Sequence, residues 1–295
     1  MHLEVWQIIV LALLQGITEL FPVSSLGHTV ILPVLLGMGD VEMDDNFLAL
    51  ITALHLGTCV ALLIYFRQEW FGMARTVVGV LKEGELRRDS EGWISWLIII
   101  GCIPAGLLGI FFANDLKMLF ASPIPATLFL LLNGGVLFGG EQLRRRAEKT
   151  MLLMSPQERE AHFRPLKALS WKEALIIGLV QALALLPGFS RLGVTLVAGL
   201  GLNMTHEDAA RYSFLLSTPL ILGASLIELP SLFHEDPSTL MLIFLGMVVA
   251  GVAAYFSTRW LMRYFRTGRL DPFAYYCWGM GTIALALFLA LHIGF

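Results

Sequence analysis

Long apolar stretches alternate with short polar ones along this chain, at the spacing of membrane-spanning helices. A bilayer core about 30 Å thick is crossed by roughly 17 to 25 apolar helical residues. Six stretches have that length: 47–66, 94–112, 126–143, 209–228, 240–258 and 272–293. We therefore predict six transmembrane helices in an all-α integral membrane protein.

Two further apolar regions are interrupted by polar and turn-forming residues. Residues 6–36 break at Phe21-Pro22, and residues 173–202 break at Pro187-Gly188. Each half is too short to cross a bilayer alone. Paired hydrophobic segments interrupted by Gly or Pro are typical of discontinuous helices. We predict a re-entrant helical hairpin at each interruption.

The composition supports this class and excludes others. Hydrophobic residues make up 57% of the 295 residues and charged residues only 15%, and the mean hydropathy is +0.74. A soluble domain has about 25% charged residues, so the chain does not fit a water-soluble enzyme. A net charge of -3 gives no sign of nucleic-acid binding. The three cysteines lie in apolar runs without metal-ligand spacing, and the first residues lack the basic segment of a signal peptide.

The distribution of positive charge predicts the topology. Seventeen of the 20 Lys and Arg residues fall in the loops 67–93, 144–172 and 259–269. Basic loops remain in the cytoplasm, so these three loops are expected there. The loop 37–46 carries four acidic residues and no basic one, which is expected outside. If residues 6–36 form a hairpin, both termini of this single membrane domain, residues 1–295, lie outside. A single full span at 6–36 would instead place the N-terminus in the cytoplasm, and charge alone leaves both open.

An internal repeat relates the two halves of the chain. The segment from Gln15 to Thr29 aligns without gaps on Gln181 to Thr195. Each copy comprises one hairpin and three spans, in residues 1–143 and 173–295, separated by the cytoplasmic loop 144–172. Because three spans are an odd number, the second copy is inverted in the membrane. We expect the two hairpin tips to meet near the bilayer midplane.

The residues that the repeats do not share are the candidates for chemistry. Glu19 and His28 occur only in the first copy, and Arg191 only in the second. Ionisable groups inside a membrane are costly, which makes them functional candidates. Ser24, Ser25 and Ser190 are suited to cap the helices that follow the breaks. Two helix N-termini and a guanidinium at one point predict a phosphate or diphosphate site, where Glu19 would bind a divalent cation or manage a proton.

Two motifs resemble the signatures of a known family. Gln15-x-x-x-Glu19 with Pro22-Val23-Ser24-Ser25-x-Gly27-His28, and Pro187-Gly188-Phe189-Ser190-Arg191-x-Gly193-x-Thr195, are similar to those of undecaprenyl-pyrophosphate phosphatases, the bacitracin-resistance family. The resemblance implies hydrolysis of undecaprenyl pyrophosphate to undecaprenyl phosphate and inorganic phosphate with a divalent cation, Mg²⁺ or Ca²⁺. It also implies recycling of the cell-wall lipid carrier on the outer side of the bacterial inner membrane.

The motif positions imply a role for each residue. Ser25 would be the nucleophile with His28 as its proton partner, and Glu19 with Gln15 would serve the metal and the acid–base chemistry. Arg191 would hold the phosphates, together with Ser24, Gly27, Gly188, Ser190 and Thr195. Direct attack by water, with Ser25 only orienting it, is an open variant. His55 carries no motif and is interpreted as structural or pocket-lining.

Two positions depart from the family pattern. Leu26 and Leu192 replace a threonine and a serine at equivalent repeat positions, a change that we interpret as subfamily variation.

Two other functions stay open beside the enzyme. Broken helices at the midplane also suit a polyprenyl-phosphate transporter, and a binding protein without turnover is the third alternative. The expected partners are the polyprenyl diphosphate and the bilayer, without nucleic acid. The sequence leaves the oligomeric state open, a homodimer included.

Overall fold

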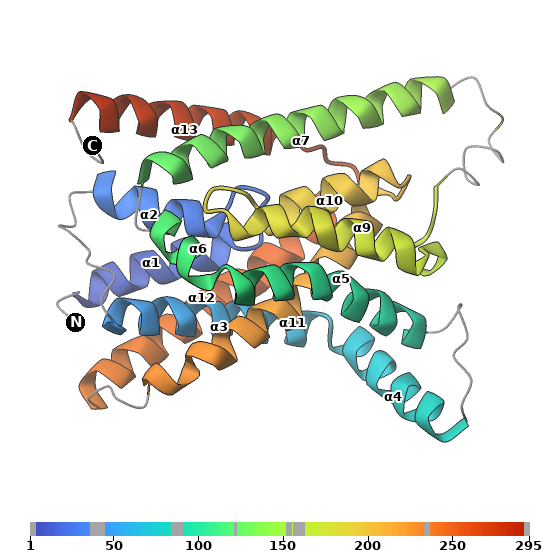
Figure 1. Cartoon of the computed structure of the whole chain (residues 1–295), viewed down its shortest axis with the longest axis horizontal. Helices are drawn as coiled ribbons and strands as arrows, with labels where there is room; N and C mark the ends of the chain where they lie inside the picture. The colour runs from blue at the N-terminus through green and yellow to red at the C-terminus, as the bar shows by residue number, and fades with distance from the viewer. Residues whose placement is uncertain are drawn as a thin grey trace.

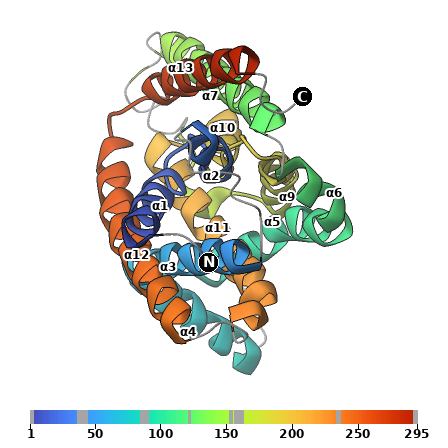
Figure 2. The ribbon, with the colours of Figure 1, turned by 90° about the vertical axis from the view of Figure 1, so that its left-hand side faces the viewer.

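A computed structural model describes residues 4–35, 45–83, 91–120, 123–151, 155, 163–232 and 237–291. Within these ranges every regular element is a helix. Most helices run along the long axis of the molecule (Figure 1). Viewed down that axis, α2 (Ser25–Leu35) and α10 (Arg191–Gly201) lie toward the centre of the bundle (Figure 2). Most of the acidic loop 37–46 lies outside the described residues, as do residues 233–236, which include Glu235 and Asp236.

Five of the six expected spans are helices long and apolar enough to cross a membrane. They are α5 (Glu91–Phe111), α7 (Pro123–Met151), α11 (His206–Leu232), α12 (Pro237–Tyr264) and α13 (Asp271–Ala290). The sixth, expected at 47–66, is α3 (Asp45–Tyr65), which meets the same test only together with α4 (Arg67–Glu83), bent from it by 77°. The chain is a multi-pass membrane protein.

The basic loops are more helical than expected. Residues 67–93 contain α4, α7 continues through Arg144–Arg146 to Met151, and the short helix α6 (Ala113–Phe120) was not predicted. The end of an apolar run marks the membrane boundary and need not end a helix, because long basic side chains can reach polar partners from a helix surface. Arg145 does so, with its guanidinium 2.5 Å from the Asp271 carboxylate.

Both interrupted segments break where expected. Helix α1 (Val5–Thr18) is followed by a turn that ends at Ser24, whose φ is 68°. In the second segment, α9 (Trp171–Gln181) continues into a short 3₁₀ helix, η2 (Ala182–Leu185), before the Pro187-Gly188 turn and α10. Gly188 has a φ of 111°, and a Cβ there would lie 2.3 Å from the Ala126 carbonyl. Both conditions require glycine.

The helices before the breaks pack against spans from the opposite half of the chain. Helix α1 contacts α12, and α9 contacts α5. Each contact is close: a Cβ on Gly16 would lie 2.4 Å from the Ala250 carbonyl, and one on Gly178 would lie 2.3 Å from the Gly101 carbonyl. Small residues let membrane helices approach in this way. The two halves are therefore interlocked.

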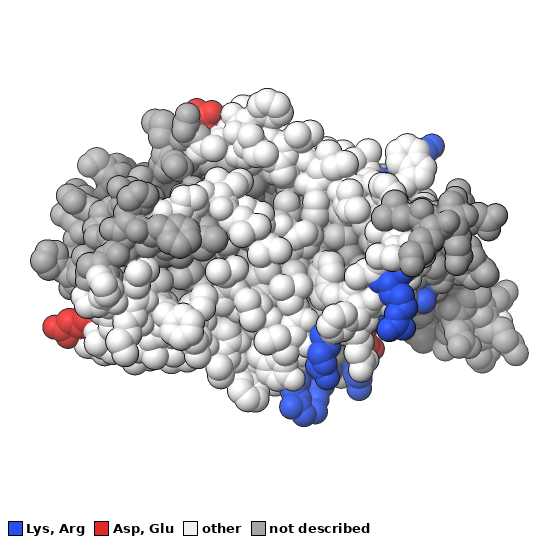
Figure 3. Space-filling view, turned by 90° about the horizontal axis from the view of Figure 1, so that it is seen from below, with Lys and Arg blue, Asp and Glu red and all other residues white. Residues whose placement is uncertain are grey.

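The outer surface matches a bilayer environment. Large apolar side chains are exposed on the spans, for example Ile110, Phe111, Met241 and Phe244. On the face shown in Figure 3, most of the Lys and Arg side chains lie toward one end, and the middle carries no charge. That end is where α4 and α7 end in Figure 1.

Candidate active site

The two helix interruptions contact each other through a pair of serines. The Ser24 hydroxyl oxygen accepts hydrogen bonds from the N–H groups of Gly27 and Gly188, both at 3.2 Å. The Ser190 hydroxyl donates to the Phe21 carbonyl at 3.2 Å. A Cβ on Gly27 would lie 3.1 Å from the Gly188 Cα, so a side chain there would press against the second break.

Two helices begin at this junction. Ser24 caps α2 through Gly27, and Ser190 caps α10 by accepting from the Gly193 N–H at 3.1 Å. The prediction that Ser24 and Ser190 cap these helices is confirmed, whereas Ser25 is the first residue of α2. The structure thus brings two helix N-termini together, and the N–H groups at helix starts favour anions.

Asn133 on α7 ties the two breaks together and was missed in the sequence. Its amide donates to the Pro22 carbonyl and accepts from the Ser190 N–H, each at 3.0 Å. The side chain is fully buried. A lone amide in an apolar span was the available signal, because such a group needs partners inside the protein.

Glu19 is the centre of the polar cluster at the junction. One carboxylate oxygen accepts hydrogen bonds from the Gln15 amide, at 3.1 Å, and from the Ser25 hydroxyl. The same oxygen lies 3.4 Å from His55 Nε2, and the other lies 3.7 Å from the Arg191 guanidinium. The Glu19 side chain is only 6% exposed. The first break therefore supplies a buried carboxylate, and α10 supplies the cation beside it.

The pairing of Ser25 with His28 is not present. His28 Nδ1 donates to the Ser24 carbonyl at 2.6 Å, which leaves Nε2 to accept from the Tyr276 hydroxyl at 2.8 Å. The Ser25 hydroxyl instead donates to Glu19. The reason is local: an imidazole reaches the carbonyl four residues earlier on its own helix. Sequence reasoning gave no signal for Tyr276, which lies 248 residues away along the chain.

His55 lies closer to the chemistry than the sequence indicated. Its Nδ1 donates to the Ile51 carbonyl at 2.8 Å, so the ring presents Nε2 to the Glu19 carboxylate. A ring that carries a second proton donates to that carboxylate, whereas a neutral ring does not. The imidazole beside the Ser25–Glu19 pair is therefore His55, supplied by α3.

Two buried polar atoms of the cluster have no hydrogen-bond partner in the described part of the chain: a guanidinium nitrogen of Arg191 and the amide oxygen of Gln15. The first is a donor for a phosphate oxygen. The second is an oxygen ligand for a hard cation. Buried groups without partners are uncommon in folded proteins. Here the two flank Glu19, and one favours an anion whereas the other favours a cation.

The remaining candidate side chains bond within their own helices or pack in the core. The Thr195 hydroxyl donates to the Arg191 carbonyl at 2.7 Å, as the Thr29 hydroxyl does to the Ser25 carbonyl at 3.0 Å. The structure thus uses the proton of Thr195 inside α10, although a phosphate ligand was expected. Leu192 is 2% exposed and lies in the apolar core. Its departure from the family pattern therefore falls on a packing position.

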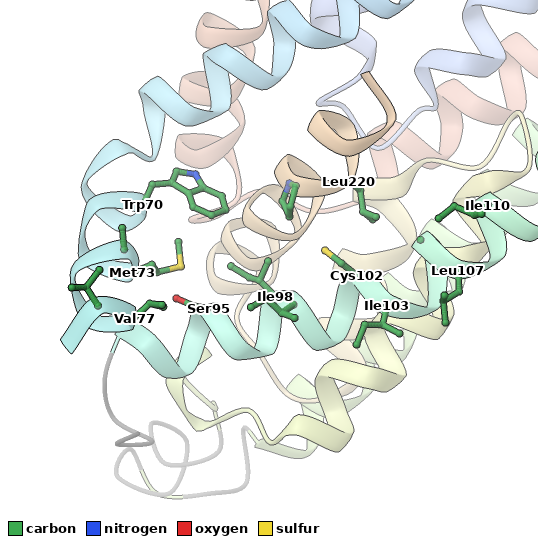
Figure 4. A pocket seen from close by; sticks show the side chains of 15 residues that line it. Trp70, Met73, Val77, Ser95, Ile98, Cys102, Ile103, Leu107, Ile110 and Leu220 are labelled. Atoms are coloured by element: carbon green, nitrogen blue, oxygen red, sulfur yellow. The ribbon is translucent and has the colours of Figure 1, made fainter. Parts of the chain in front are cut away.

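The described residues also form an apolar groove. It has a volume of about 770 Å³ and runs between α4, α5 and α11 (Figure 4). Trp70, Met73, Ile98, Cys102 and Leu107 are among the side chains that line it. The volume is within the range of small-molecule sites.

Known proteins are similar to this chain over nearly its full length. Residues 8–283 match the family model described as bacitracin resistance protein BacA. The chain is 42% identical to undecaprenyl-diphosphatase 2 of Burkholderia thailandensis over 288 residues, covering 97% of this chain and 98% of that protein. It is 40% identical to undecaprenyl-diphosphatase of Mycolicibacterium paratuberculosis, covering 99% of both chains. Both motif segments lie within residues 8–283, and the chain belongs to the BacA bacitracin resistance family.

Proposed function

We propose that this protein hydrolyses undecaprenyl diphosphate to undecaprenyl phosphate and inorganic phosphate, and that it thereby recycles a lipid carrier and confers bacitracin resistance. The observation that carries the chemistry is the Ser25 hydroxyl bonded to the buried Glu19 carboxylate, with Arg191 3.7 Å from that carboxylate. A nucleophile, a base and a cation meet where two helices begin. The names of the relatives supply the substrate.

In the first step, the Ser25 oxygen attacks the terminal phosphorus and Glu19 takes the hydroxyl proton. A bond forms between Ser25 Oγ and phosphorus, and the bond from phosphorus to the bridging oxygen breaks. Undecaprenyl phosphate leaves, and Glu19 passes the Ser25 proton on to His55 Nε2, which lies 3.4 Å away. Water then attacks the phosphoserine and gives one proton to the ionised Glu19. Glu19 returns that proton to Ser25 Oγ as the bond from Oγ to phosphorus breaks and inorganic phosphate departs. Direct attack by water, oriented by Ser25 and Glu19, is the variant to be separated by experiment.

Arg191 and the helix starts stabilise the charge that develops on the phosphate oxygens. The guanidinium nitrogen that lies 3.7 Å from Glu19 has no hydrogen-bond partner among the described residues and is a preformed donor, and the N–H groups that begin α2 and α10 add their partial charges. These groups are fixed before the substrate arrives, so they lose little free energy to reorganisation. His28, held between Ser24 and Tyr276, positions the first break.

His55 is placed to exchange a proton with Glu19, because its Nε2 lies 3.4 Å from the carboxylate oxygen that accepts from Ser25. Once the ring has accepted the proton that Glu19 took from Ser25, the carboxylate is free to accept the next one.

The donor set fits a divalent cation held jointly with the substrate. Glu19 and the unpartnered Gln15 amide oxygen would be its protein ligands. The described residues contain no group of three or more His, Cys, Asp or Glu that could hold a metal ion. Mg²⁺ commonly binds one or two protein oxygens together with substrate phosphates. When bound, such a cation neutralises charge on the diphosphate oxygens.

We also propose that the two broken segments are re-entrant hairpins of an inverted repeat that meet near the midplane. The equivalent serine caps at Ser24 and Ser190, and the paired contacts of α1 with α12 and α9 with α5, support this arrangement. In a bacterial inner membrane the basic loops would lie on the cytoplasmic side. Both termini would then lie outside, and the site would open to the outer side.

The test is phosphate release from undecaprenyl diphosphate by purified protein in detergent, with and without Mg²⁺ or Ca²⁺. We expect metal-dependent release that Ser25→Ala and Arg191→Ala both lose. Arg266→Ala is the matched control, since that arginine forms an exposed ion pair with Glu207. Substantial release by Ser25→Ala would favour direct water attack, and lipid binding without any release by the wild type would favour a transporter.

A further inference from the structure

The last turns of α12 carry two adjoining columns of side chains on the outer surface of the molecule. Arg259 and Arg263 form one column, and Phe256 and Trp260 form the other. Residues three or four apart lie on the same face of a helix, so the two columns are neighbours. All four side chains are exposed, Phe256 by 62% and Trp260 by 50%. These four residues are named the α12 surface patch.

The arginines of the α12 surface patch have no counter-charge within the described part of the chain. Arg266, just after α12, pairs with Glu207 at 3.2 Å. The guanidinium groups of Arg259 and Arg263 form no ion pair or hydrogen bond with a described residue. Because they lie one helical turn apart and carry long side chains, both can reach the oxygens of one phosphate group.

The α12 surface patch lies where a membrane span meets the polar boundary of the bilayer. Helix α12 is long and apolar enough to cross a membrane, and the basic residues 259–269 begin in its last turns. Exposed tryptophan at the end of a span occupies the level of the lipid head groups. Toward the middle of the span the surface continues as apolar side chains, with Val252 54% exposed. A ligand that fits both parts has an anionic group joined to a hydrocarbon chain.

We propose that the α12 surface patch binds an anionic phospholipid of the bilayer. Arg259 and Arg263 hold the phosphodiester, and the first part of an acyl chain packs on Phe256 and Trp260. Two unpaired cations favour a lipid with a net negative charge over a zwitterionic lipid, whose own cation offsets its phosphate. Basic residues beside a span attract anionic lipids in this way.

Trp260 connects this patch directly to the candidate active site. Its ring is stacked on the ring of Phe21, with the centroids 5.5 Å apart and the planes 10° from parallel. Phe21 belongs to the first break, and its carbonyl accepts the Ser190 hydroxyl at 3.2 Å. A lipid that covers the exposed side of Trp260 restrains this stack and, through it, the contact between the two breaks. The lipid should therefore raise turnover, a consequence that rests on the proposed function.

The first test measures lipid retention and does not depend on activity. Detergent-purified protein is titrated with phosphatidylglycerol or phosphatidylcholine, and the bound lipid is counted by native mass spectrometry. We expect the wild type to prefer phosphatidylglycerol and the double variant Arg259→Ala, Arg263→Ala to bind it at least about tenfold more weakly. The matched control is Arg67→Ala, Arg75→Ala, which removes two exposed arginines from α4 and should retain the preference.

Three results of this titration would overturn the proposal. The wild type could bind both lipids equally, or the α4 variant could lose as much affinity as the α12 variant, which would indicate a general effect of charge. Undecaprenyl phosphate could instead be retained by the patch while phosphatidylglycerol is not, which would assign the arginines to the substrate's own phosphate.

The second test measures the connection through Trp260. Phosphate release from undecaprenyl diphosphate is compared in phosphatidylcholine vesicles with and without phosphatidylglycerol. We expect phosphatidylglycerol to raise kcat of the wild type about fivefold, and not to raise kcat of the Arg259→Ala, Arg263→Ala variant. Trp260→Leu should still retain the lipid through both arginines yet show no rise.

A rise of the same size in Trp260→Leu would refute the connection, and so would a wild type whose kcat is the same in both vesicles. If the wild type released no phosphate in either kind of vesicle, the proposed function would have failed, and the retention measurement would still decide whether the lipid site exists.

Discussion

Replacing Glu19 by glutamine tests whether Glu19 or His28 takes the proton of Ser25. The glutamine side chain has almost the same shape, so its carbonyl oxygen can still accept from the Ser25 hydroxyl and from the Gln15 amide, as the carboxylate does at 3.1 Å from the latter. What it cannot do is take up a proton. The variant therefore preserves the geometry and removes the base.

The magnitude follows from what the base contributes. General-base catalysis by a positioned side chain accounts for roughly 10² to 10⁴ in rate, or about 3–5 kcal/mol of activation free energy. We expect Glu19→Gln to lower kcat by a factor in that range. Tyr276→Phe removes the hydroxyl that donates to His28 at 2.8 Å. Because His28 only positions the first break, we expect a loss in kcat of less than about tenfold there, which corresponds to the roughly 0.5–1.5 kcal/mol that one hydrogen bond contributes.

The assay is phosphate release at saturating undecaprenyl diphosphate, with thermal unfolding in detergent to confirm that each variant is folded. Glu207→Gln is the matched control, since Glu207 forms an exposed pair with Arg266 at 3.2 Å. A folded Glu19→Gln protein with a nearly normal kcat, beside a Tyr276→Phe protein with a severe loss, would refute the reasoning. The base would then be His28, and the conformation described here would differ from the reacting one.

Three further outcomes test the cluster and its supports. Asn133→Leu leaves two buried backbone groups without partners, so thermal unfolding should show a loss of about 2–6 kcal/mol, and an unchanged melting temperature would contradict the bridge. Gln15→Ala removes an oxygen ligand, and the Mg²⁺ concentration for half-maximal activity should rise about tenfold while kcat at saturating Mg²⁺ changes little; an unaltered Mg²⁺ titration would exclude that ligand. The Arg164 guanidinium lowers the pKa of Glu173 from 4.5 to about 2, so this pair stabilises the fold above pH 4.5 and the contribution is lost as the pH falls toward 2. Arg164→Ala should therefore melt below wild type at neutral pH and converge with it near pH 2, and a constant difference would refute the linkage.

The sequence predicted the elements whose signal is local. Apolar length identified five spans, and Pro22 and Pro187-Gly188 identified both helix breaks, because each signal reflects the chemistry of a single segment. Helix α4 was missed since its charged residues resemble those of a loop. Its apolar residues, such as Met73 and Val77, line the groove beside α5. This packing partner cannot be identified from the sequence of α4 itself.

The sequence predicted which residues form the candidate site, but the predicted pairing of Ser25 with His28 was wrong. The motifs named Glu19, Ser25 and Arg191, which the structure brings together. The partners of Ser25 and His28 could not be read from the chain, because spacing in sequence does not determine the direction of a side chain. Asn133, His55 and Tyr276 come from three different spans, and only the packing of those spans places them at the breaks.

The division of the chemistry between the two halves has a consequence for how the site can be damaged. Ser25 and Glu19 come from the first break and Arg191 from the helix after the second, so neither half holds a complete site. The two breaks are joined directly by two hydrogen bonds, from Gly188 to Ser24 and from Ser190 to Phe21, each 3.2 Å long. A substitution that loosens this link changes the distance from base to guanidinium without touching either. Loss of activity at the junction should therefore exceed the loss of stability, because a displacement of about 1 Å can cost about 10²-fold in rate.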